Sequence, residues 1–538
     1  MHNPAQHHAE AAQAAKAGRL CLILHAHLPF VRHPEHPQFL EEDWLFEAIT
    51  ETYVPILVMA ERLRNEKVPF QFAMTLSPPL CEMLADPLLQ DRYAKHLAGR
   101  LDLIERERHR SRNPAAVEVY RKLFRQAHDI VERRNGRRLL GAFRGLQDSG
   151  HLEILTCGAT HGFLPNMGRP EAVNAQVGVA VANYKKHFGR APRGIWLPEC
   201  GYAPGVDAAL ARHGIQWFVV DGHGVMNGSR VPKRGVFAPV RTPHGVAVFA
   251  RDRESSKQVW SAKEGYPGDG LYREFYRDLG YDADLEYIKP YLHPDAVRRN
   301  LGLKYHRITG EVPLHEKQMY DPGAAHAKAE EHAGNFVFNR GQQARWLGSK
   351  LGAPPTIVSP YDAELFGHWW FEGPQFLESV ARRMADPSSD VALVSPSEVL
   401  KIENRLQTLE PSMSTWGDKG YAEVWLNGAN DWMIRHQHRA EDRMVEMARK
   451  RPGATGLERR ALTQAARELL LAQSSDWAFL ITVGTSAPYG HRRFKDHITR
   501  FTRLADEIEK GAIDEGRLHQ DETGDSIFQE LDFRIYAS

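Results

Sequence analysis

The chain has 538 residues, of which 42% are hydrophobic and 25% charged, and its formal net charge is +1. This length exceeds what one hydrophobic core usually holds, so we expect more than one domain. Basic and acidic residues nearly balance, which gives no electrostatic basis for binding nucleic acid or an anionic membrane surface. No apolar run approaches the ~20 residues of a membrane-spanning helix.

Four cysteines are scattered along the chain without a CxxC pair, which indicates a reducing compartment and not a disulfide framework. Residues 1–18 are rich in alanine and histidine and have no apolar core, so we predict a disordered leader and not a signal peptide. Both features favour a cytoplasmic protein.

The first part of the chain alternates predicted strands and helices. An apolar run predicts a buried strand over Arg19–Ala26, helical spacing of apolar residues predicts a helix over Asp43–Glu66, and Phe70–Met74 predicts a second strand. The mostly charged segment Leu88–Asp148 is predicted to be a helical insertion. Such alternation is typical of a parallel sheet with crossover helices.

The alternation resumes after the insertion. Further strands are predicted at His151–Thr156, Arg193–Leu197, Gln216–Val220, Gly245–Ala250, Thr356–Ser359 and Val391–Ser395. The strand signal nearly stops after Pro396, and helices are predicted over Asn430–Lys450, Leu457–Ser474 and His491–Lys510. We therefore expect a barrel of β/α units over residues 19–400 and a helical domain over residues 401–538.

Polar and aromatic residues crowd the loops that follow several predicted strands. In barrels of β/α units these loops meet at the carboxyl ends of the strands and carry the active site. His25 and His27 lie two residues apart on a strand, so they point the same way and could bind sugar hydroxyls or a metal. His161 follows a later strand, in ATHGFLP. A structural role remains an alternative for each histidine.

Carboxylates are the second feature of these loops. Glu199 lies in WLPECGY, where aromatic neighbours suit the C–H face of a sugar ring. Asp362, Glu364 and Glu372 compete for a second role in SPYDAELFGHWWFEGP, and Asp362 is slightly favoured because it lies nearest the strand end. Paired carboxylates suit glycoside cleavage, in which one attacks the anomeric carbon and the other, with a raised pKa, protonates the leaving oxygen.

The predicted helical domain offers further candidates. Trp416 lies in STWG, Trp425 in WLNG and Asp476 in QSSDW. The tryptophans could line a carbohydrate groove or bury a domain interface.

Together and in this order, these segments resemble the conserved regions of glycoside hydrolase family 57, and most closely those of its 1,4-α-glucan branching enzymes. The resemblance runs from about residue 19 to the C-terminus and includes QVW at 258–260 and KYHRITG at 304–310. It implies an α/β fold, a (β/α)7 barrel with a helical insertion over about 88–148 and a C-terminal helical domain that completes a glucan groove. It implies an α-glucan such as amylose or glycogen as substrate, with no cofactor and no metal.

The resemblance also implies residue roles. Glu199 is the expected nucleophile and Asp362 the expected general acid/base, which separates Asp362 from its two competitors. The predicted substrate-binding residues, taken from pattern and resemblance together, are His25, His27, His161, His223, Arg277, Trp416, Trp425 and Asp476. The implied reaction cleaves an α-1,4 bond, holds the donor as a glycosyl-enzyme ester and transfers it to a glucan 6-hydroxyl, which forms an α-1,6 branch.

One departure concerns a catalytic loop. Similar branching enzymes are expected to carry a tyrosine near the tip of the loop after the Glu199 segment, but no tyrosine occurs from Ala203 to Gly265. The corresponding segment, about Gly222–Arg241, offers His223 and Phe237 among others. If water replaces the glucan acceptor, the outcome is hydrolysis, so the balance between branching and hydrolysis depends on this region.

Three alternatives stay open. The first is an α-amylase or 4-α-glucanotransferase of the same family. The second is a metal-dependent sugar deacetylase or mannosidase-like enzyme, in which His25 and His27 would hold Zn²⁺. The third is a glucan-binding protein without catalysis, which the presence of both carboxylates disfavours.

Overall fold

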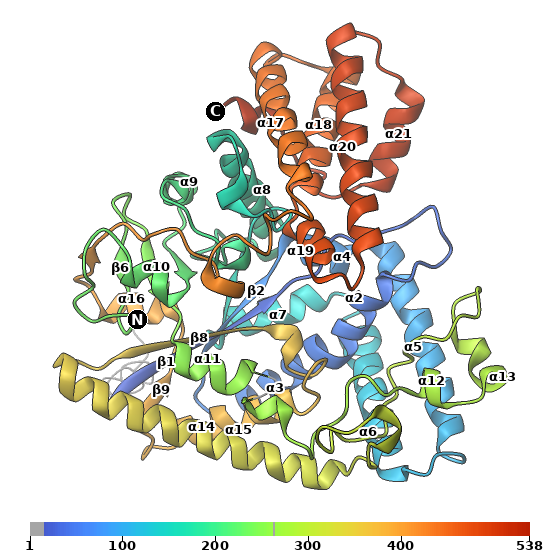
Figure 1. Cartoon of the computed structure of the whole chain (residues 1–538), viewed down its shortest axis with the longest axis vertical. Coiled ribbons are helices and arrows are strands. Elements are labelled where there is room, and N and C mark those ends of the chain that lie inside the picture. Colours follow the sequence, from blue (N-terminus) through green and yellow to red (C-terminus); the bar gives the residue numbers. More distant parts are fainter. Residues whose placement is uncertain (1–15, 262–263) are drawn as a thin grey trace.

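The computed structural model describes residues 16–261 and 264–538 (Figure 1). Most of the predicted leader at 1–18 lies outside the described residues, and strand β1 begins at Gly18. Among the helices in the described ranges, none has both the length and the apolar character needed to span a membrane.

Seven parallel strands form the centre of the molecule. They are β1 (Gly18–Ala26), β2 (Phe72–Leu76), β3 (Leu152–Leu155), β4 (Gly194–Ile195), β5 (Trp217–Val220), β7 (Ala247–Ala250) and β8 (Thr356–Asp362). β3, β2, β1 and β8 are neighbours in one sheet, and β4, β5 and β7 are neighbours in a second. A parallel bridge between Thr156 and Ile195 joins the sheets on one side. On the other, the Asp252 N–H donates to the Val358 carbonyl at 2.8 Å.

One buried cluster fills the space that the seven strands surround. Every strand or its immediate end contributes to it, through residues that include Cys21, Ile23, Ala73, Leu155, Trp196, Trp217, Val219, Phe249 and Val358. Inward-pointing side chains that meet in one cluster are the feature expected of a small barrel interior, which is packed and not open. The strand order and this cluster agree with the (β/α)7 arrangement implied by the motifs.

Helices surround the strands. The segment before β2 forms α2 (Glu42–Ala48), the π-helical η1 (Ile49–Tyr53) and α3 (Val54–Asn65). After β2 comes α4 (Pro78–Ala85), and the segment predicted as an insertion forms α5 (Pro87–Glu107), α6 (Pro114–His128), η2 (Asp129–Arg134) and α7 (Leu139–Asp148). Later crossovers use α8 (Pro170–Phe188), α9 (Val206–Arg212), α11 (Arg253–Trp260), α14 (Pro322–Leu351), α15 (Gly373–Ala385) and α16 (Pro396–Ile402). α14 packs on α15 and β1 and crosses the lower part of Figure 1.

The C-terminal helices stand together beside the barrel, in orange and red in Figure 1. They are α17 (Trp432–Lys450), α18 (Gly456–Ala472), α19 (Ser475–Val483), α20 (Ala487–Lys510) and α21 (Glu515–Gly524). Before α17, β10 (Gln407–Thr408) pairs with β6 (Val240–Arg241), and Ser414 bridges to Tyr202. The chain from residue 403 to 431 therefore runs along the barrel before the helices begin, and the predicted domain boundary near residue 400 stays a prediction.

Each predicted strand has a counterpart in the structure, with ends that differ by a few residues. The last one, Val391–Ser395, becomes β9 (Val391–Leu393), which pairs with the start of β1. The 30-residue helix α14 is not among the predicted elements. Its buried face relies on Ala325, Ala329 and Ala333, which give a weak hydrophobic period.

Asp252 connects three elements at the junction of β7 and α11. Its side chain caps α11 by accepting from the Ser255 N–H at 2.9 Å. The same carboxylate accepts from Arg340 of α14 at 3.3 Å and from Gln343 at 3.2 Å. Arg340 is fully buried, so Asp252 balances a charge that water cannot reach.

We expect Asp252→Ala to destabilise the protein by about 3–5 kcal/mol, because it leaves the buried Arg340 guanidinium short of a partner and removes a helix cap. Thermal unfolding followed by circular dichroism measures the effect as a lower melting temperature. Glu254→Ala is the matched control, because Glu254 also accepts from Arg340 but its side chain is 59% exposed. Equal losses in the two variants would contradict this role of Asp252.

Candidate active site

Glu199 lies on a strained turn directly after β4. The turn is a single 3-10 step, Pro198–Cys200, in which Glu199 and Cys200 have φ of +63° and +51°. Non-glycine residues rarely adopt this left-handed region, and such strain costs ~1–3 kcal/mol and clusters at functional sites. Cys200 is buried in the barrel cluster, whereas the Glu199 side chain keeps 16% of its surface exposed. The turn thus presents a carboxylate at the end of a barrel strand.

Two donors from outside the barrel strands hold this carboxylate. The indole N–H of Trp416 donates to Glu199 Oε2 at 2.9 Å, and the Ser475 hydroxyl donates to Oε1 at 3.3 Å. The backbone N–H of Trp416 also donates to the Glu199 carbonyl at 3.0 Å. The segment before α17 and the first turn of α19 therefore complete the site that begins on β4.

A chain of hydrogen bonds runs from Glu199 to β1. His161 Nδ1 lies 2.8 Å from Ser475 Oγ, and His161 Nε2 lies 2.9 Å from His25 Nε2. Burial lowers the pKa of both histidines well below the usual value, so both are neutral at pH 7. Since Ser475 donates to Glu199, it accepts from the His161 Nδ1–H, and His161 Nε2 then accepts from His25. Each ring has one fixed tautomer in this order.

Asp362 ends β8 beside the same histidines. In the parallel pairing of β1 and β8, its Cα lies opposite that of His25. Burial raises the pKa of Asp362 to about 8, with a further contribution from the charge of Glu364. Glu364 accepts hydrogen bonds from the Tyr53 hydroxyl and from the His27 backbone N–H, and burial raises its pKa to about 7.

The two catalytic candidates differ in protonation near neutral pH. Burial raises the pKa of Glu199 to about 7, the Trp416 hydrogen bond opposes this shift, and the nearby Asp362 charge adds to it. Asp362 therefore keeps its proton at a pH where Glu199 has begun to lose its own. One protonated acid beside one ionised carboxylate is the arrangement that glycoside cleavage requires.

The third competitor lies in a different environment. Glu372 accepts from the Tyr320 hydroxyl at 2.6 Å and from the Arg273 backbone N–H at 3.2 Å, and it is only 2% exposed. These contacts bind Glu372 to the segment that follows α11 and to the start of α14, so it serves packing there.

His27 and Asp476 form the opposite edge of the site. His27 Nε2 lies 3.1 Å from Asp476 Oδ2, and His27 Nδ1 lies 2.8 Å from Ser77 Oγ. Burial alone would raise the pKa of Asp476, but His27 and other donors lower it to about 2, so Asp476 is ionised.

A cluster of His27, His161 and Asp476 has potential metal ligand atoms within 4.8 Å of one another. The two imidazole rings, however, stack face to face, with centroids 3.8 Å apart and planes 9° apart. Stacked rings direct their in-plane lone pairs along parallel planes, and both nitrogens of His161 contact protein groups. This geometry disfavours a zinc site, which needs lone pairs that converge on one point.

The remaining predicted substrate-binding residues lie in different places. Trp416 contacts Glu199 directly, and its ring stacks on that of Trp260 with centroids 6.2 Å apart. His223 bonds to Asp221 at 3.0 Å and to the Gly420 carbonyl at 2.8 Å, on the wall of a neighbouring cavity.

Two of the predicted substrate-binding residues, Trp425 and Arg277, contact other parts of the chain instead of the site. Trp425 is 3% exposed and stacks on Phe163 at 4.8 Å, so it packs the segment after Trp416 and offers no free face to a sugar. Arg277 bonds to Asp282 at 2.9 Å and to the Leu314 carbonyl at 2.8 Å, within the segment between α11 and α14. The structure thus does not bring either side chain to Glu199.

Several side chains at the site are not among the predicted residues. Ser475 and Tyr53 hold carboxylates, Ser77 holds His27, and Trp196 stacks on His25 with centroids 4.8 Å apart. Ser475 and Trp196 belong to the motifs QSSDW and WLPECGY, so the motifs contained a signal for them. Nothing in the local sequence distinguishes Tyr53 or Ser77.

The sequence model of glycosyl hydrolase family 57 matches residues 21–340. The chain belongs to this family. A second model, that of the 1,4-alpha-glucan branching enzyme C-terminal region, matches residues 436–536 and includes Ser475 and Asp476. The resemblance inferred from the motifs is thereby confirmed.

Relatives of this family-57 chain match it over nearly its whole length. It is 36% identical to a 1,4-alpha-glucan branching enzyme of Thermococcus kodakarensis, over 97% of this chain and 79% of the relative. A crystal structure of an alpha-amylase from Thermotoga maritima is 45% identical, with a TM-score of 0.91 over 97% of this chain and 99% of that one. A family 57 branching enzyme structure from Pyrococcus horikoshii is 35% identical, with a TM-score of 0.87 over 97% of each chain. These similarities confirm the predicted α/β fold with a helical C-terminal region.

The protonation states predict a bell-shaped pH dependence of kcat/KM on amylose, with its maximum between about 7 and 8. Activity rises as Glu199 ionises and falls as Asp362 loses its proton. Trp416→Phe removes a donor to ionised Glu199, so its pKa rises and the acidic limb moves to higher pH by about one unit. Glu364→Gln removes a charge that raises the pKa of Asp362, so the alkaline limb moves to lower pH.

Steady-state kinetics across pH measures both limbs. Trp260→Phe serves as the control for Trp416→Phe, because Trp260 stacks on Trp416 but is not a donor to Glu199, so the acidic limb should stay in place. If Trp416→Phe or Glu364→Gln moved the acidic and alkaline limbs together in one direction, the assignment of one limb to Glu199 and the other to Asp362 would be contradicted.

Proposed function

We propose that the protein is a 1,4-α-glucan branching enzyme that acts with retention of configuration. The observation that carries this proposal is the pair Glu199 and Asp362, in which the nucleophile is held by Ser475 from the region that matches the branching-enzyme C-terminal model. The similarity to branching enzymes over nearly the whole chain supports the same conclusion.

The reaction follows from the two carboxyl groups. Asp362 gives its proton to the oxygen of an α-1,4 bond as that bond breaks, and the Glu199 carboxylate bonds to the anomeric carbon, which forms a glycosyl ester. The Asp362 carboxylate then takes the proton from a glucan 6-hydroxyl. The hydroxyl oxygen attacks the anomeric carbon and releases Glu199, which leaves an α-1,6 branch. Two inversions give net retention.

Hydrolysis is the second candidate outcome, and two observations favour it. One is the 45% identity to an alpha-amylase, and the other is the missing tyrosine between Ala203 and Gly265. The segment Gly222–Arg241 contacts the chain at and just before β10, because Arg234 pairs with Glu403 at 2.6 Å and the Lys233 N–H donates to Gln407 at 2.8 Å. Where this segment leaves the ester open to water, water takes the place of the 6-hydroxyl.

We further propose that the protein takes part in glycogen synthesis in the cytoplasm, because a branching reaction on amylose-like chains belongs to that process. The four cysteines are free and buried, which supports folding in a reducing environment.

Proton NMR of amylose incubated with the enzyme tests the function. The account predicts new α-1,6 anomeric signal with few new reducing ends, because the ester is transferred and not hydrolysed. A rise in reducing ends without α-1,6 signal would instead make the protein a hydrolase on the same site.

Two variants test whether the measured activity depends on Glu199 or on the competing carboxylate Glu372. Glu199→Gln removes the nucleophile and should lower turnover by at least about 10³-fold. Glu372→Gln makes the same isosteric change at the competing carboxylate and should retain turnover within about tenfold. Circular dichroism confirms that both variants are folded, and equal losses in the two would contradict the assignment.

A further inference from the structure

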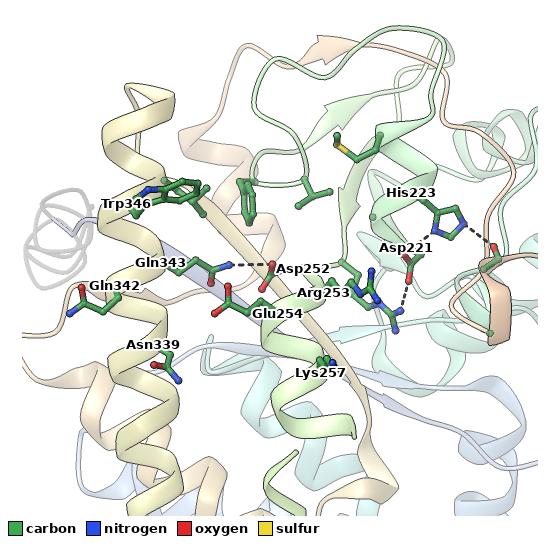
Figure 2. Close-up of a pocket in the computed structure, with 18 of the residues that line it drawn as sticks. Asp221, His223, Asp252, Arg253, Glu254, Lys257, Asn339, Gln342, Gln343 and Trp346 are labelled. Carbon is green, nitrogen blue, oxygen red and sulfur yellow. Dashed lines mark hydrogen bonds and ion pairs between the residues drawn. The ribbon is translucent and has the colours of Figure 1, made fainter. Parts of the chain in front are cut away.

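A cavity of about 1300 Å³ lies beside the active site, and neither Glu199 nor Asp362 lines it. Its walls come from α11, α14, the segment 221–237 after β5 and the segment 417–420 after Trp416 (Figure 2). The volume exceeds that of pockets built for one small ligand, which are typically ~300–1,000 Å³. It is therefore large enough to hold several sugar units.

One face of α14 supplies polar and aromatic groups to this cavity. Asn339, Gln342, Gln343 and Trp346 occur at positions i, i+3, i+4 and i+7, so their backbone positions share a face of the helix. In Figure 2, Gln343 and Trp346 extend from α14 toward Asp252 and the opposite wall, whereas Gln342 projects from the other side of the helix. Trp346 is 62% exposed, so its indole face is open to a ligand. Carboxamides bond to hydroxyls, and an indole face stacks on a sugar ring.

Several charged residues around the cavity are paired with opposite charges, although the lining residues Arg253 and Lys419 have no ion pair among the described residues. Arg251 pairs with Asp221, and Lys257 pairs with Glu264. The Asp252 carboxylate is engaged by Arg340. Pairing of this kind weakens the attraction of these groups for an anionic ligand such as a phosphate or nucleotide. A neutral, hydroxyl-rich ligand fits these walls better.

Two parts of the cavity lining neighbour active-site residues along the chain. Gly417 lines it and directly follows Trp416, whose indole bonds to Glu199. On α11, Lys257 lines the cavity one helical turn before Trp260, which is 53% exposed and stacks on Trp416. The cavity lining thus adjoins, along the chain, both tryptophans that stack beside Glu199.

We propose that this cavity is an accessory site for a distal stretch of an α-1,4-glucan chain, with Trp346 as its stacking surface and the carboxamide of Asn339 as a hydrogen-bonding group. The site rests on the substrate class of the proposed function. Its role is to hold long chains, so it adds affinity for polymeric glucan without touching the reacting bond.

Native gel electrophoresis in gels that contain glycogen or amylopectin tests the site. Glu199→Gln is the background, so the polymer is bound without turnover. On this background Trp346→Ala should weaken polymer affinity by about three- to tenfold, the effect expected for loss of one stacked aromatic. Phe338→Ala is the matched control, because Phe338 lies on the same helix and is also 62% exposed but does not line the cavity.

The outcomes separate this site from the proposed function. Equal retardation of the Trp346→Ala and Phe338→Ala proteins, or no retardation of any variant by either polymer, would overturn the accessory site. Weaker retardation of Trp346→Ala alone supports it, even if NMR of wild-type products shows no α-1,6 signal and the branching assignment fails. Conversely, branching activity with equal retardation would leave the function standing and remove the site.

Discussion

The orientation of the Glu199 carboxylate is the constraint on which the rest of the structure depends. The turn after β4 places this side chain on strained, left-handed backbone, and the barrel strands supply neither of its two hydrogen-bond donors. Trp416 and Ser475 come from the C-terminal third of the chain. The hydrogen bonds to this carboxylate, which we propose as the nucleophile, therefore require the barrel and the C-terminal region to be packed together.

The same constraint determines the protonation of the site. Neutral His25 and His161 fix the direction of the hydrogen bonds that lead to Ser475. The Ser475 hydroxyl is therefore oriented to donate to the Glu199 carboxylate. Asp362, which ends the neighbouring strand of β1, has no comparable donor among its described contacts, and burial raises its pKa above that of Glu199. The hydrogen bond from Trp416 thus helps to keep the pKa of Glu199, the proposed nucleophile, below that of Asp362, the proposed acid.

The barrel strands and several of the site residues could be predicted from the sequence, because the strands are short apolar runs and the functional loops follow them directly. β1 is an example, since its apolar run and the HAHLP segment after it predict both a buried strand and a polar end. The sequence did not predict α14, because alanines form much of its buried face and give a weak hydrophobic period. The cavity-lining residue Trp346, which lies on α14, was therefore not predicted either. Trp425 resembled a groove residue, but exposure is decided by tertiary packing, here against Phe163. Tyr53 could not be predicted, because it is far from Glu364 in the sequence and only the folded chain brings its hydroxyl to that carboxylate.

Trapping the glycosyl ester tests the central claim most directly, namely that Glu199 is the covalent nucleophile. In Asp362→Ala the second step lacks its base, so α-maltosyl fluoride, whose leaving group needs no protonation, should load the enzyme and leave the ester in place. Peptide mass spectrometry should then find the added maltosyl mass on the peptide that contains Glu199. A stable adduct on another carboxylate, such as Glu364 or Glu372, would contradict the account.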